Sequence, residues 1–173
     1  NEETAQTIVS GMGELHLEII RNKMVRDLGL DVRVGRPRVA YKETIRSEGE
    51  AEARFVRQTG GRGQFAVVKL QVKSMLPEPG QDPIIFHDAT KGGVVPREYI
   101  PAVRQGVMNA ATAGPLAGYP MQNIEVFLID GKDHPVDSSE LAFEQAGSMA
   151  FAAAVAKADP VSLGPIMHLQ VTT

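Results

Sequence analysis

Apolar and polar residues alternate along two neighbouring stretches in the first half of the chain. Charged residues alternate with small or apolar ones across residues 50–56, and every second residue of 66–72 is apolar. A period of two is typical of strands with one buried face. Between these stretches, residues 57–65 hold three glycines, which permit tight turns and close backbone approach. The pattern therefore predicts a β-hairpin whose tip presents Arg62 and Gln64.

A period of three to four residues marks the N-terminal part of the chain. Apolar residues recur at this spacing over residues 14–28, which predicts a helix, and Gly29 is a suitable stop. The runs at 7–10 and 30–34 have the composition of strands on either side of it. A strand, a helix and a strand make only half of a small α+β sandwich. We therefore expect residues 1–36 to be a truncated domain.

The remaining pattern predicts strands followed by alternating strands and helices. Prolines and glycines separate the stretches, and Gly106 inside one predicted helix costs that helix about 1 kcal/mol relative to alanine. The predicted elements are strands at 38–45, 50–56, 66–72, 84–89 and 121–129, helices from 97 to Gly114-Pro115 and from 138 to 157, and the start of a strand at 166–171. This order predicts an α+β domain from about residue 37 to 160.

A cluster of polar residues precedes the second of these helices. Asp137 and Glu140 have the D-x-x-E spacing of a capping box, so we expect them to cap the helix. The preceding loop, residues 130–135, carries Lys132 and His134. If this loop and the hairpin loop lie at the same end of the sheet, that end is a functional edge.

Composition narrows the class of protein. Of the 173 residues, 43% are hydrophobic and 23% are charged, which is typical of a soluble globular protein. No apolar run reaches the roughly 18 residues that a membrane span needs. The chain has no cysteine, which excludes disulfides and thiolate metal sites. It begins at Asn1 without a signal peptide, so we expect a piece of a cytosolic protein.

Charge is distributed unevenly around a net value of −3. Residues 32–62 hold eight Lys or Arg against four acids, whereas residues 130–159 hold two Lys against six acids. Such a distribution is typical of solvated faces. The overall charge argues against indiscriminate nucleic-acid binding, but a basic hairpin can still bind phosphates locally.

Patterns typical of enzymes fit the chain poorly. Residues 61–66 match G-x-G-x-x-A, but a dinucleotide-binding turn leads into a helix and here a strand pattern follows. No phosphate-binding G-x-x-x-x-G-K-[ST] is present, and the histidines lack the spacing of a metal site. A hydrolase using Asp133, His134 and Ser138 is an alternative that requires a pocket with nucleophile and base in reach.

Four longer motifs resemble bacterial elongation factor G, in the same order and at compatible spacing. They are IVSGMGELHLE at 8–18, FVRQTGGRGQ at 55–64, GGVVPREYIPAV at 92–103 and VDSSELAF at 136–143. The resemblance covers essentially the whole chain, and four motifs in register are more specific than any single glycine pattern.

The resemblance implies a piece of a multidomain translational GTPase. Residues 1–36 would end its ferredoxin-like third domain, residues 37–160 would form its fourth domain, and residues 161–173 would begin its fifth. The implied fourth domain is an α+β fold like the second domain of ribosomal protein S5, with a left-handed βαβ crossover. GTP and Mg²⁺ would bind a G domain outside these residues, so the resemblance implies no catalytic residue, cofactor or metal in this chain.

The resemblance also implies partners and site residues. The partners would be the ribosome at the small-subunit decoding site, the tRNA anticodon region and mRNA, and the protein would be a cytoplasmic monomer that contacts no membrane. Arg62 would contact phosphate, Gln64 a sugar or base edge, and His134 the anticodon-side backbone. The residues expected to contact RNA are Gly60, Gly61, Arg62, Gly63 and Gln64 in one loop and Lys132, Asp133 and His134 in the other.

Two places depart from the family's usual pattern. Asp133 and Pro135 flank His134 where the family usually has an aromatic residue before it and an acid after it, and residues 65–67 replace a pattern with glycine and histidine. The acid beside His134 repels phosphate. A paralogue specialised for ribosome recycling therefore stays open, and a free-standing RNA-binding protein is the alternative from another class.

Overall fold

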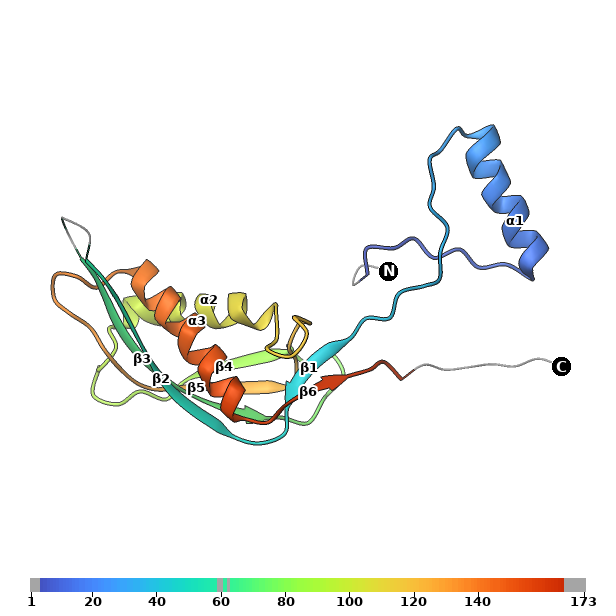
Figure 1. The fold of residues 1–173 in the computed structure, drawn as a ribbon. Helices are drawn as coiled ribbons and strands as arrows, with labels where there is room; N and C mark the ends of the chain where they lie inside the picture. Colours follow the sequence, from blue (N-terminus) through green and yellow to red (C-terminus); the bar gives the residue numbers. More distant parts are fainter. Residues whose placement is uncertain (1–3, 59–60, 62, 167–173) are drawn as a thin grey trace. The chain divides into compact units, whose positions relative to one another are not determined.

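The structure is a computed structural model that describes residues 4–58, 61 and 63–166. The chain divides into two compact units, residues 1–40 with 164–173 and residues 41–163 (Figure 1). Each unit is described by itself below. Within the described residues, no helix has the length and apolar character that crossing a membrane requires.

The first unit is organised by a single helix. Helix α1 (Glu14–Asn22) continues into a π-helical turn, η1 (Lys23–Asp27), and Gly29 follows with a φ of +63°. This left-handed residue ends the helix as predicted. The strands predicted at 7–10 and 30–34 are wrong, since neither stretch is a strand in the structure. A strand needs a neighbour to bind its backbone N–H and C=O groups, and the described residues supply none there.

The second unit contains two β-sheets and two longer helices. A four-stranded sheet has the order β2-β3-β5-β4, and a two-stranded sheet joins β1 to β6. The strands are β1 (Lys42–Ile45), β2 (Gly49–Arg57), β3 (Gln64–Ser74), β4 (Ile84–Asp88), β5 (Ile124–Lys132) and β6 (Pro160–Leu163); the helices are η2 (Arg97–Tyr99), α2 (Ile100–Ala111) and α3 (Glu140–Lys157). The predicted α+β fold class is confirmed.

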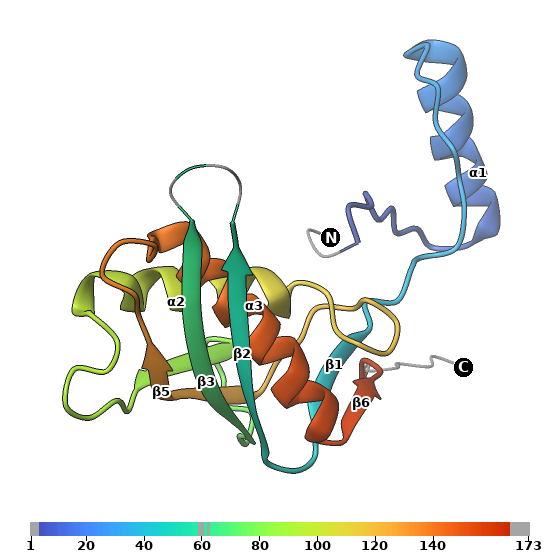
Figure 2. The ribbon, with the colours of Figure 1, turned by 60° about the vertical axis from the view of Figure 1, so that its left-hand side comes forward.

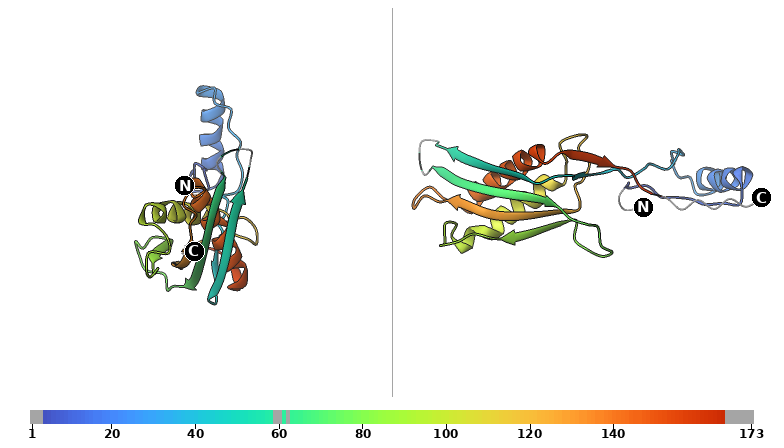
Figure 3. Two further views of the ribbon diagram at one scale, coloured as in Figure 1. Left: turned by 90° about the vertical axis from the view of Figure 1, so that its left-hand side faces the viewer. Right: turned by 90° about the horizontal axis from the view of Figure 1, so that it is seen from below.

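Both α2 and α3 cover one face of the four-stranded sheet, and neither helix lies on the other face (Figure 2, Figure 3). Alternation in the strands explains this arrangement. Inward residues of β3 and β5 such as Val68, Leu70 and Val126 are fully buried, while their neighbours along the strand are half-buried on the other face. The apolar layer between sheet and helices is the core that fixes the strand ends in place.

Strand direction places three connections at one end of the sheet. β2 and β3 are antiparallel with Arg57 opposite Gln64, so residues 58–63 connect the two strands at the tip of the hairpin. β5 is antiparallel to β3 and parallel to β4. The segments that follow β4 and β5 therefore leave the sheet at the end where the hairpin turns.

Several predicted boundaries are corrected by the structure. The predicted strand at 38–45 is a strand only over β1, Lys42–Ile45. Strand β6 was not predicted, because Pro160 indicates the end of the preceding helix. β5 runs to Lys132, past the predicted end at 129, because β3 is long enough to pair with it and a bulge between Lys69 and Leu70 adjusts the register. Of the strand predicted at 166–171, only Ile166 lies within the described residues, and it is not in a strand.

Candidate functional site

Asp137 ties the base of the hairpin tip to the segment that precedes α3. Its Oδ1 atom accepts a hydrogen bond from the Gly63 backbone N–H at 3.1 Å, and its carbonyl oxygen accepts one from the Phe65 N–H at 2.8 Å. A Cβ atom on Gly63 would lie 3.1 Å from the carboxyl carbon of Asp137. A glycine at position 63 therefore allows this close approach.

The predicted capping role of Asp137 is wrong. Helix α3 begins at Glu140, and its N-cap is Ser139, whose Oγ accepts a hydrogen bond from the Ala142 N–H at 3.2 Å. Three consecutive residues of capping type, Asp137 to Ser139, precede the helix, so spacing alone could not decide between them. The tertiary contact with Gly63 uses the Asp137 carboxylate instead.

The buried Ser138 hydroxyl links the start of β3 to the segment that follows β5. The residue is only 4% exposed, and its Oγ donates to the Phe65 carbonyl oxygen at 2.8 Å while accepting from the His134 N–H at 2.8 Å. Both hydrogen-bonding roles of the hydroxyl are occupied by backbone groups. Ser138 therefore does not serve as the nucleophile in the hydrolase alternative.

The backbone around His134 sets the orientation of its ring. Nδ1 accepts hydrogen bonds from the N–H groups of Val136 at 3.3 Å and Asp137 at 3.2 Å. An imidazole that accepts at Nδ1 carries its proton on Nε2, so the 3.6 Å approach of an Asp137 oxygen to Nδ1 is not an ion pair in this form. The side chain is 49% exposed. His134 thus offers an Nε2–H donor on a ring that the turn holds in place.

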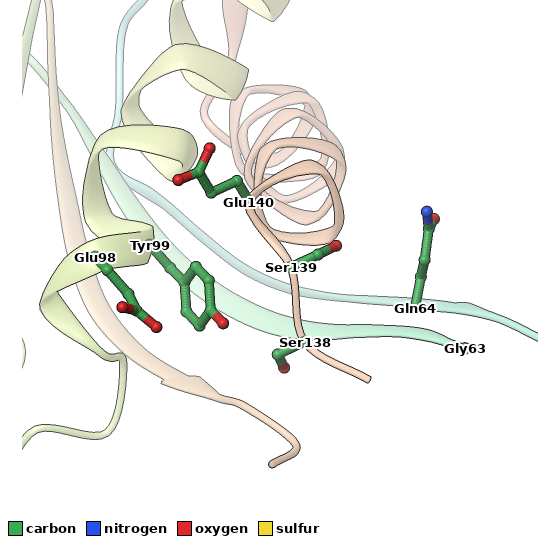
Figure 4. Close-up of a pocket in the computed structure, with 7 residues that line it drawn as sticks. All are labelled: Gly63, Gln64, Glu98, Tyr99, Ser138, Ser139 and Glu140. Carbon is green, nitrogen blue, oxygen red and sulfur yellow. The ribbon is translucent and has the colours of Figure 1, made fainter. Parts of the chain in front are cut away.

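A hollow of about 440 Å³ lies between these loops and the start of α2 (Figure 4). Gln64 and Tyr99 line it, and the Tyr99 ring stacks on Phe143 with centroids 4.7 Å apart. Glu98 and Glu140 add two carboxylates. The hollow therefore favours donor groups such as base or sugar edges over phosphate.

Exposed cations lie at the same end of the sheet as the hollow. Arg57 ends β2, Lys132 ends β5, and Lys91 lies in the 89–96 connection after β4; all three are exposed. Each belongs to a different connection at this end of the sheet. This end of the sheet therefore carries positive charges that can bind phosphate groups.

The residues predicted for the site fall into three groups. Gly61, Lys132 and His134 are exposed, although Lys132 belongs to β5 and not to a loop as predicted. Gln64 and Asp133 are half-buried and Gly63 is buried. Gly60 and Arg62 lie outside the described residues.

Sequence reasoning missed the residues that hold the site together. Phe65 receives three contacts from the 133–139 segment: two through its backbone and one between its ring and that of His134, whose centroids are 6.0 Å apart. Tyr99 and Glu98 reach the hollow from the first turn of the helix before α2. The only sequence signal for these roles is an aromatic residue directly after the glycine-rich loop.

Asp137→Ala is expected to loosen the tip without unfolding the sheet. Loss of a part-buried hydrogen bond to a carboxylate is worth about 1 kcal/mol, so hydrogen exchange of the Gly63 amide should accelerate about fivefold. Asp137→Asn keeps an acceptor oxygen and should change exchange less. Asp133→Ala, at a nearby acid, is the matched control. Unchanged exchange in Asp137→Ala would contradict the assigned role.

Comparison with known proteins shows similarity along the whole chain. Residues 37–159 match the family described as elongation factor G, domain IV, and residues 1–36 match elongation factor G, domain III. Elongation factor G of Thermotoga maritima and that of Thermotoga neapolitana are each 51% identical over all 173 residues. The chain spans about a quarter of the length of these curated relatives, with 25% of each covered.

A solved structure shares the fold. A crystal structure of a protein from Thermus thermophilus superposes with a TM-score of 0.80 and 37% sequence identity. The superposition covers 93% of this chain and 23% of that one. The shared region therefore includes most of this chain.

Proposed function

Because the chain belongs to the elongation factor G family, we propose that it is the part of a ribosomal translocase that enters the decoding site of the small subunit. There it promotes the movement of tRNA and mRNA. One observation in the structure supports this most directly. Three hydrogen bonds join the hairpin base to the 133–139 segment, so two connections distant in sequence are held together at the tip.

The chemistry of this tip suits RNA. A-form RNA is recognised by its shape and by its 2′-hydroxyl and phosphate groups, which need donors and cations on a fixed surface. His134 offers an Nε2–H, Gln64 an amide, and Lys132 a positive charge at the end of β5. Arg62 is proposed as a further phosphate contact and Gly60 and Gly61 as close backbone approaches; Asp133 would lie beside the RNA without binding phosphate.

The proposed action is mechanical. The tip occupies the space that a tRNA leaves and discourages its return, while GTP hydrolysis with Mg²⁺ takes place in a G domain outside these residues. Residues 1–36, 37–160 and 161–173 are proposed to belong to the third, fourth and fifth domains of that protein. We expect no catalytic activity from this chain, and we expect the protein to act in the cytoplasm as a monomer.

The test replaces Gln64 and His134 with alanine in the full-length protein. Single-round translocation is expected to slow about tenfold, equivalent to about 1.4 kcal/mol of lost transition-state stabilisation, while GTP hydrolysis stays normal. Loss of two donors to RNA accounts for the effect, since neither residue is one of the buried core residues. Rapid kinetics of mRNA movement and phosphate release measure the two steps separately.

A matched control replaces the same residue types away from the tip. Gln71 and His87 lie on β3 and β4, and the double alanine variant at these positions should translocate normally. If the tip variant translocates at the normal rate, the tip assignment is wrong. Slower ribosome splitting together with normal translocation would instead favour the recycling paralogue, to which the departures at Asp133 and Pro135 point.

A further inference from the structure

Strand β4 leaves one row of backbone groups without partners. The Pro83 carbonyl oxygen accepts from Ile124 N–H at 3.3 Å, and Ala89 N–H donates to the Leu128 carbonyl at 2.9 Å. Because backbone direction alternates along a strand, odd-numbered residues of β4 face β5 and Ile84 and Phe86 face away. In the part of the chain that the structure describes, nothing hydrogen-bonds to the backbone of Ile84 or Phe86. β4 is the margin of the sheet (Figure 3).

The opposite margin of the sheet, β2, is protected against pairing with a further strand, and β4 is not. β2 carries exposed Glu50, Glu52 and Arg54, and the Lys157 ammonium group donates to the Glu50 carbonyl oxygen at 3.1 Å. Charged side chains on an edge strand are a usual defence against unwanted pairing. β4 reads Ile-Ile-Phe-His-Asp and has no lysine or proline within it. Its margin is therefore open to a further strand.

A hollow of about 450 Å³ lies beside this margin, between β4 and α2. Helix α2 lines it with side chains three and four positions apart, which share one face of the helix. Ile84, only 4% exposed, and Met108 supply apolar surface. The lining residues are Asp82, Pro83, Ile84, Pro101, Arg104, Gln105 and Met108. An edge strand with a helix-walled groove next to it is the arrangement that accepts an extended peptide.

Charge in the groove selects the kind of peptide. Arg104 is exposed on α2, and no ion pair or hydrogen bond engages its guanidinium group within the described residues. Asp82 lies at the strand end of the same hollow. A carboxylate on the incoming strand would pair with Arg104, and a donor would suit Asp82.

We propose that the β4 margin and this groove bind an extended segment of a partner protein, which pairs with Ile84 and Phe86 as an additional strand and places a carboxylate against Arg104. This surface is separate from the tip and its use does not depend on the proposed function. The apolar side chains of the segment would enter the groove on alternate positions.

A phage-displayed library of random heptapeptides, selected on the whole 173-residue chain, provides the probe. Enriched peptides are expected to alternate apolar residues and to contain an acid. On binding, the amide protons of Ile84 and Phe86 should become protected from exchange in NMR spectra. Methylation of alternate backbone nitrogens in the peptide, which removes its edge hydrogen bonds, should abolish binding.

Charge reversal tests the groove. Arg104→Glu should weaken binding of the enriched peptide about tenfold or more, and replacing the peptide's acid by lysine should restore it. Arg97→Glu, at another exposed arginine near the start of α2, is the control and should bind normally. Since Arg104 is exposed, the variant should melt at the wild-type temperature.

Three results would overturn the proposal. One is a library without enrichment over an unrelated protein, and another is enriched peptides that leave the exchange of Ile84 and Phe86 unchanged. The third is protection of these amides by a second copy of the chain or by a short RNA in place of peptide, because the margin would then serve a different occupant.

Discussion

Replacing Glu43 with alanine is expected to lower the free energy of unfolding by about 4 kcal/mol. Glu43 lies on β1 and is 0% exposed. Its carboxylate oxygens accept hydrogen bonds from the backbone N–H groups of Leu116, Ala117 and Tyr119 at 3.0, 2.9 and 3.1 Å. Removal leaves these three part-buried donors without a partner, at about 1–3 kcal/mol each before water re-enters. Urea denaturation of the whole chain measures the loss.

Two variants separate the carboxylate from other effects. Glu43→Gln keeps one acceptor oxygen and should cost less, about 2 kcal/mol. Glu52→Ala removes an exposed glutamate from β2 and should change stability by less than about 0.5 kcal/mol. Equal stability of Glu43→Ala and wild type would show that the loop finds other acceptors.

The same carboxylate makes stability depend on pH. Burial alone raises the pKa of Glu43, but the hydrogen bonds from the 116–119 backbone together outweigh it, so the pKa lies below its ordinary value of 4.5. The folded state therefore holds this proton less tightly than the unfolded state. Its contribution is fully present above pH 4.5 and is lost as pH falls through the folded pKa. Wild type should lose more stability on acidification than Glu43→Gln.

Gly106→Ala is expected to destabilise the protein by about 2 kcal/mol, although alanine is the better helix former. A Cβ atom at this position would overlap the carbonyl oxygen of Glu144 and come within 3.0 Å of the Ser148 amide nitrogen. These are backbone atoms of α3, which cannot move without shifting the helix. Overpacking of this kind costs about 3 kcal/mol, and helix propensity returns only about 1 kcal/mol.

The sign of this effect makes the test decisive. Propensity alone predicts that Gly106→Ala stabilises the protein, whereas close helix packing predicts the opposite. Thermal or urea unfolding distinguishes them. Gln105→Ala, on the exposed side of α2, is the control and should change stability by about 0.5 kcal/mol or less. A more stable Gly106→Ala protein would mean that α2 and α3 separate easily.

Gly147 of α3 makes the reciprocal close approach to α2. On α3, a Cβ atom at Gly147 would lie 2.8 Å from the Val103 carbonyl oxygen of α2. Two glycines thus face each other's helix at one crossing. In the sequence, Gly106 only weakens the prediction of a helix. The backbone of α3, which leaves no space for a side chain at this position, lies about 40 residues further along the chain.

Local pattern determined which segments become strands and helices in the second unit. A period of two over 50–56 and 66–72 sufficed for β2, β3 and the hairpin tip, because a strand with one buried face must alternate. In the first unit, sequence also located Gly29 as a helix stop. Glycines located the connection between β2 and β3, whereas Gly131, predicted in a loop, lies in β5. The family followed from four motifs in register, which the comparisons confirm.

Tertiary structure decided everything that depends on a partner distant in sequence. In the fold, the Asp137 carboxylate accepts a hydrogen bond from Gly63 and does not cap α3. Pairing with β3 extends β5 beyond its predicted end. Residues 7–10 and 30–34 have no strand partners among the described residues. The fold also buries the Glu43 side chain of β1 against a loop that lies more than 70 residues further along the chain. A hydrogen bond or a close approach between distant segments leaves no periodic trace, so sequence can name the residues but only the fold shows what they contact.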